Sequence, residues 1–89
     1  MQLKDKAEIQ SLVNAARGAQ GFAAADDDAG EKIYALCAPV AAEFGDVNAL
    51  PISTWFLLAA QIIPLTFGPD GLNPDNIIAV IKMIQQIFT

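Results

Sequence analysis

The second half of the chain is almost free of charge, and this feature constrains the fold more than any other. Residues 47–89 carry three charged side chains, whereas residues 1–46 carry twelve. A monomeric protein usually keeps a charged surface without large apolar patches. We therefore expect another chain, an apolar ligand or a membrane surface to cover part of this half. The alternative is that residues 47–89 form the core and that the first half wraps them.

Residues 73–88, NPDNIIAVIKMIQQIF, predict the best-defined helix. Asn73 is a favoured N-cap, Pro74 suits the first helical position, and Asp75 places negative charge at the positive end of the helix dipole. Polar or small side chains recur along one narrow stripe, and apolar side chains span a broad arc on the rest of the helix. That arc is wider than one neighbouring helix needs, so we expect this helix to lie between partners.

Residues 52–67, ISTWFLLAAQIIPLTF, predict a second strongly apolar helix, for which Ser53 is the expected N-cap. Because nearly all its faces are apolar, we expect a buried central helix. At sixteen residues it is shorter than the ~20 needed to span a bilayer, which leaves an interfacial membrane segment as the alternative. Residues 68–71, GPDG, predict a tight turn that pairs the two helices into an apolar hairpin.

The first half of the chain predicts two more charged helices. Apolar positions spaced by three and four residues favour one helix from Leu3 to about Gln20 and another from about Ala29 to Phe44. Pro39 predicts a kink in the second, or its division into two, because proline removes a hydrogen bond and clashes with the preceding turn. Gly45 is expected to cap its end. The sequence thus predicts an all-α compact bundle of four short helices, or five, in a single domain over residues 1–89.

An acidic run interrupts the helical pattern at residues 23–30, AAADDDAG. We interpret it as a connection, with Asp28 and Glu31 forming a capping box at the start of the second helix. Metal binding is the weaker interpretation, because the run lacks the alternating ligand spacing of a calcium loop.

Composition excludes several kinds of chemistry. The net charge is −5 and the five basic residues are scattered, so no nucleic-acid partner is expected. The chain has no His, the commonest general base and metal ligand. Its one cysteine, Cys37, lies on an apolar helix face and is expected to be a buried thiol rather than a nucleophile. We expect no catalytic residues, no cofactor and no metal, and a cytoplasmic location, since the N-terminal residues lack the apolar stretch of a signal peptide.

The leading hypothesis is a non-enzymatic protein–protein interaction or assembly module, a homo-oligomer or a subunit of a larger assembly, that binds through the apolar hairpin. A second hypothesis is a small acidic inhibitor that binds a basic site on another macromolecule. A third is a carrier or sensor of an apolar ligand or membrane surface, built on Trp55, Phe56, Leu58 and Ile62. The candidate partner interface consists of Trp55, Phe56, Ile78, Ile81, Met83 and Ile87, and the candidate acidic contact consists of Asp26, Asp27, Asp28 and Glu31.

Overall fold

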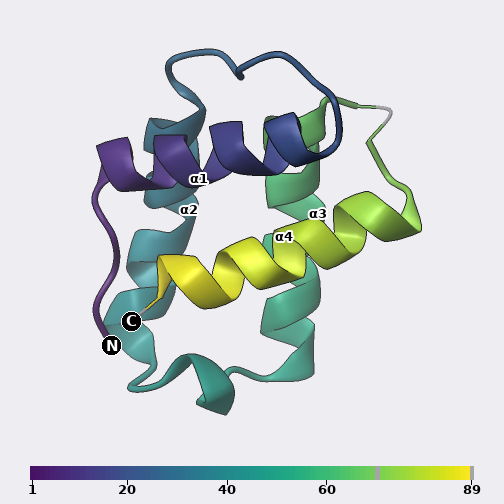
Figure 1. The fold of residues 1–89 in the computed structure, drawn as a ribbon. Coiled ribbons are helices and arrows are strands. Elements are labelled where there is room, and N and C mark those ends of the chain that lie inside the picture. The colour runs from purple at the N-terminus through teal and green to yellow at the C-terminus, as the bar shows by residue number, and fades with distance from the viewer. Residues whose placement is uncertain (70, 89) are drawn as a thin grey trace.

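The computed structural model describes residues 1–69 and 71–88. In these residues the chain forms four α-helices and one short 3-10 helix, and it forms no strand beyond an isolated bridge. Helices α1 and α4 lie across one side of the molecule and cross over α2 and α3 behind them (Figure 1). The all-α bundle predicted from the sequence is confirmed. The elements are α1 (Lys6–Ala19), α2 (Ala29–Glu43), η1 (Val47–Ala49), α3 (Ile52–Phe67) and α4 (Pro74–Ile87).

The predicted start of α4 is confirmed. Asn73 Oδ1 accepts a hydrogen bond of 3.0 Å from the backbone N–H of Asn76, and Pro74 occupies the first helical position. Helix α1 begins in the same way, because Asp5 Oδ1 accepts a 2.8 Å hydrogen bond from the Glu8 N–H. Such caps satisfy backbone donors that have no partner within the helix.

Two predicted N-caps are wrong, although α2 and α3 begin where the sequence predicts. Asp28 makes no side-chain cap bond, because its backbone is already in a helical conformation (φ −94°, ψ 0°). Its carboxylate instead pairs with Lys32 Nζ at 3.1 Å. Helix α3 begins at Ile52, so Pro51 rather than Ser53 occupies the N-cap position.

Helix α2 continues through Pro39 as one element, so its division into two helices is wrong, and the kink stays a prediction. Its C-cap is Phe44 in an extended conformation, and Gly45 does not take the positive φ expected of a capping glycine. Gly68 ends α3 with φ +83°, a conformation that side chains other than glycine rarely adopt. The Gly71 N–H then donates to the Gly68 carbonyl at 3.1 Å, as the GPDG turn predicts, whereas Asp70 lies outside the described residues.

All four helices contribute to one hydrophobic core. Helices α3 and α4 supply the larger shares, and the buried stripe of α4 recurs at steps of three and four residues. The most deeply buried apolar residues are Ile9, Val13, Ile33, Cys37, Ile62, Val80, Ile84 and Ile87.

The N-terminal segment lies beside the end of α4 (Figure 1). Leu3 forms an antiparallel bridge with Phe88, and the Lys4 N–H donates to the Ile87 carbonyl at 3.0 Å. Lys4 Nζ donates to the Gln86 carbonyl at 2.6 Å, which places a positive charge at the negative end of the α4 dipole. The N-terminal segment therefore fixes the last turn of α4.

Candidate interaction surface on α3 and α4

A groove of about 270 Å³ lies between the first half of α3 and the outer side of α4. Trp55, Phe56 and Ala59 of α3 form one wall, and Ile77, Ile81 and Gln85 of α4 form the other. Trp55 and Phe56 precede Ala59 by four and three residues, and the three α4 residues recur at steps of four, so each wall is one side of a helix. Gln85 is the only polar residue in the lining.

Large apolar side chains protrude around this groove. Phe56 is 71% exposed and Ile81 on the opposite wall is 38% exposed. Ile52 lies one turn before Phe56 and is 73% exposed, while Ile78 lies one turn before Ile81 and is 52% exposed. We call this surface the α3–α4 face; it consists of Ile52, Trp55, Phe56, Ala59, Ile77, Ile78, Ile81 and Gln85.

Helix α3 is buried along only part of its length, which corrects the prediction of a central core helix. Its buried residues all lie at or after Leu58, and they include Ile62 and Phe67. The turns of α3 before Leu58 extend beyond the helices that cover the second half of α3. The sequence could not separate the two parts, because α3 is apolar on nearly every side throughout.

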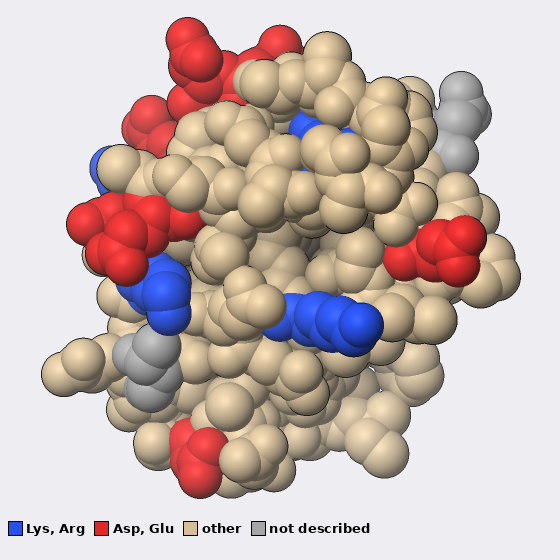
Figure 2. Space-filling view, in the orientation of Figure 1, with Lys and Arg blue, Asp and Glu red and all other residues tan. Residues whose placement is uncertain are grey.

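The α3–α4 face carries no charged residue. Figure 2 shows acidic side chains gathered at the upper left, over the starts of α1 and α2, whereas one basic side chain in the middle and one acidic side chain at the right lie along the course of α4. The acidic residues that are concentrated in the first half of the sequence are thus also concentrated on one part of the surface. An uncharged surface avoids the desolvation cost that buried charges impose on a partner.

The structure brings four of the six predicted interface residues together and separates two. Trp55, Phe56 and Ile81 line the groove, and Ile78 lies beside it on α4. Met83 and Ile87 are 3% and 0% exposed, so they belong to the core. The prediction included them because the broad apolar arc of α4 did not indicate which part faces inward.

Sequence reasoning missed four residues of the face, namely Ile52, Ala59, Ile77 and Gln85. Each lies three or four residues from a predicted member, at the spacing that places side chains on one side of a helix. Extending the stripes from Phe56 and Ile81 by one turn in each direction would have found all four.

The predicted acidic contact lies at the opposite end of the molecule. Asp26, Asp27, Asp28 and Glu31 are all exposed. The three aspartates lie on the loop before α2, Glu31 lies in the first turn of α2, and polar side chains of α1 hold the loop. Asn14 Oδ1 accepts from the Ala25 N–H at 3.0 Å, and Gln10 donates to the Asp26 carbonyl at 3.0 Å. The acidic loop is therefore bound to α1 through its backbone, and its carboxylates remain exposed.

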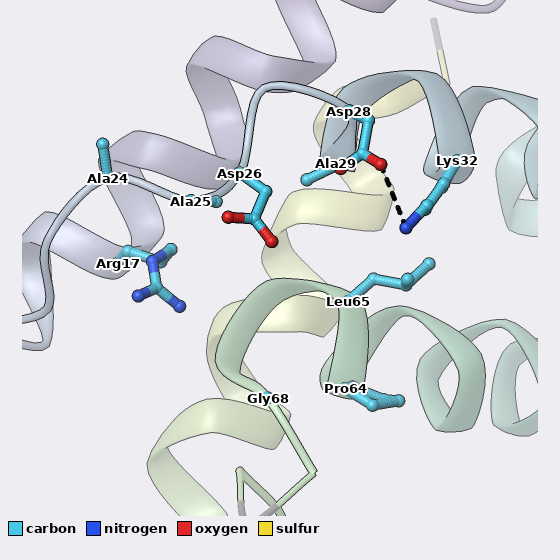
Figure 3. A pocket seen from close by; sticks show the side chains of 10 residues that line it. All are labelled: Arg17, Ala24, Ala25, Asp26, Asp28, Ala29, Lys32, Pro64, Leu65 and Gly68. Carbon is cyan, nitrogen blue, oxygen red and sulfur yellow. Dashed lines mark ion pairs between the residues drawn. The ribbon is translucent and has the colours of Figure 1, made fainter.

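Arg17 fastens the other end of this loop. Its Nε donates to the Ala23 carbonyl at 2.6 Å, and its Nη1 donates to the Thr66 carbonyl of α3 at 2.7 Å. Its guanidinium also lies 5.4 Å from the centre of the Phe22 ring. Figure 3 shows Arg17 beside a second pocket of about 290 Å³, whose lining includes Asp26 and Leu65. Because Arg17 already binds two carbonyls, its evident role is to join α1, the loop and α3.

The α3–α4 face contains no acidic, basic or thiol side chain. Cys37 is fully buried, and burial raises the pKa of its thiol to about 12. A thiol with this pKa remains protonated at neutral pH and is a poor nucleophile. Among residues 1–69 and 71–88, no group of three or more His, Cys, Asp or Glu side chains could hold a metal ion. None of the helices described for this chain is both long and apolar enough to cross a membrane.

Comparison of the chain with family models, curated proteins and solved structures gives no match. A function is therefore inferred from the surface of the molecule and the side chains on it.

Proposed function

We propose that this chain is a non-enzymatic interaction module that binds another protein chain through the α3–α4 face. One observation carries the proposal. An uncharged groove, flanked by protruding apolar side chains, lies outside a core that is already filled by other residues of the same helices. Large exposed apolar patches with this arrangement commonly mark interaction sites.

The dimensions of the groove favour a protein partner over a small apolar ligand. Ligand pockets usually measure about 300–1,000 Å³ and enclose most of the ligand surface. This groove measures about 270 Å³, and the exposed side chains of Ile52 and Ile78 lie beyond its lining. A molecule small enough to fill the groove would leave both side chains in water. A protein surface can cover the groove and its surroundings together.

The charges of the molecule favour a protein partner over a membrane surface. Helices that lie in the lipid interface usually carry Lys and Arg beside their apolar side, which attract anionic lipid. Helix α3 has no basic residue and α4 has only Lys82, on a chain with a net charge of −5. Anionic lipid would therefore repel this molecule.

The acidic-inhibitor hypothesis has weaker support. Asp26 and Asp27 are exposed on a loop that α1 holds in place, Glu31 is exposed in the first turn of α2, and Asp28 is paired with Lys32. Asp26 and Asp28 line the pocket of about 290 Å³, but Arg17 and Lys32 line it too, so a basic partner would meet charges of both signs there. The location of the protein, expected to be cytoplasmic, stays a prediction.

Dye binding tests whether the face is open to a partner. The dye is uncharged and apolar, such as Nile red, and the fluorescence of Trp55 gives a second signal. Trp55 is the only tryptophan, so its fluorescence reports on the groove wall. We expect dilute wild-type protein to bind the dye and Phe56→Glu to lose most of this binding, because the new carboxylate places a charge at the groove.

Leu57→Glu is the matched control for Phe56→Glu. Leu57 is the next residue of α3, is 62% exposed, and does not line the groove. The two variants therefore add the same charge to the same helix on different sides. Equal dye binding by both variants, or no binding by the wild type, would contradict the proposed role of the α3–α4 face.

A further inference from the structure

We propose that the partner of the α3–α4 face is a second copy of this chain, related by a two-fold axis that places Phe56 of each copy in the groove of the other. This inference rests on the proposed function, and it adds the identity and geometry of the partner.

The face contains both parts that a symmetric dimer needs. In a two-fold dimer the same surface meets itself, so any protruding group must find a recess on the same surface. Phe56 protrudes from α3 with 71% of its surface exposed, and the groove opens directly beside it. An apolar cavity of about 150 Å³ is large enough to hold a benzene molecule. The groove, at about 270 Å³, therefore has room for one phenyl ring.

Charge favours a second copy over a charged partner. Each copy presents eight residues without charge at this face, so the contact leaves no carboxylate or ammonium buried without a partner. Each copy has a net charge of −5, but most acidic side chains gather over the starts of α1 and α2, and Asp75 is the one acidic residue of α3 and α4 (Figure 2). A dimer through α3 and α4 keeps the two acidic ends apart, where salt screens their repulsion.

The size of the face predicts a weak dimer. At the exposed fractions of its side chains, and taking about 150–200 Å² for each large residue, the face offers on the order of 500 Å² per copy. Stable complexes usually bury about 800 Å² per partner. The surface is thus below the usual size, and we expect dissociation constants in the micromolar range or above rather than nanomolar.

Sedimentation equilibrium over a concentration series, from low micromolar to about 1 mM, tests this inference in the range where a weak dimer would form. The wild type is expected to pass from a mass of 9.4 kDa to twice that value as concentration rises. Phe56→Glu should raise the dissociation constant by at least about 30-fold, the loss that follows when a central aromatic anchor is removed. Leu57→Glu, which adds the same charge outside the groove, should dimerise within a few-fold of the wild type.

Two outcomes would overturn the inference. A wild-type protein that stays at 9.4 kDa throughout would exclude a second copy as the partner. If dye binding nevertheless depended on Phe56, the proposed function would stand with a different protein as partner. A dimer that Phe56→Glu leaves intact would show that the copies meet elsewhere. Circular dichroism of each variant ensures that a lost dimer is not an unfolded chain.

Discussion

At the scale of single residues, two helical glycines have opposite surroundings. Gly30 lies in the first turn of α2, where a Cβ atom would come within 2.8 Å of the Gln10 backbone nitrogen of α1. Gly18 lies in the last turn of α1, where an added Cβ would meet nothing within 4 Å. Neither has a positive φ. The difference between them therefore comes from packing, and it shows that α2 begins against the backbone of α1.

We expect Gly30→Ala and Gly18→Ala to change stability in opposite directions. Gly30→Ala forces α1 and α2 apart and should lower the free energy of unfolding by about 1–3 kcal/mol. Gly18→Ala should raise it by roughly 0.5–1 kcal/mol, because alanine loses less backbone entropy in a helix. Urea titration followed by circular dichroism measures both. A stable Gly30→Ala protein would mean that the two helices do not approach as closely as described.

At the scale of elements, α1 has a polar side that the sequence pattern did not reveal. Gln10, Asn14 and Arg17 lie three or four residues apart, and each binds the backbone of the following loop. Gln10 also accepts from the Gly30 N–H at 2.7 Å and so caps the start of α2, the role that the sequence assigned to Asp28. Side chains that bind a distant backbone leave no local spacing signal, which is why this network escaped prediction.

Asn14→Ala tests whether this network holds the acidic loop. The substitution removes the acceptor of the Ala25 N–H, so we expect that amide to exchange with solvent faster. Global stability should change by less than about 1 kcal/mol, because alanine also favours the helix. Ser11→Ala is the control, since its hydroxyl binds only the Ala7 carbonyl of its own helix. Unchanged exchange at Ala25 would show that the loop is held by other contacts.

The helices themselves were largely predictable. The extent of α3 follows from its apolar run, which the GPDG turn ends, and the cap of α4 follows from Asn73 and Pro74, which act within one turn. Contacts between elements were not predictable in the same way. Met83 and Ile81 are both apolar residues of α4, and only the packing of α4 against the other helices places the first inside and the second at the surface.

At the scale of the whole molecule, two surfaces of different character lie apart. Acidic side chains gather over the starts of α1 and α2, and the uncharged face lies on α3 and α4 (Figure 2). The two surfaces predict opposite responses to salt. Association through the α3–α4 face should be unchanged or stronger at higher salt, because repulsion between two acidic copies is screened. Binding of a basic partner by the acidic end should weaken.

Backbone amide spectra recorded on dilution test most directly which surface associates. We expect signals from the α3–α4 face, and the indole N–H of Trp55 in particular, to shift with protein concentration. Signals from Asp26, Asp27, Asp28 and Glu31 should stay in place, because the acidic loop lies outside the contact. Shifts confined to the acidic loop, or spectra that do not change with concentration, would contradict association of this chain through α3 and α4.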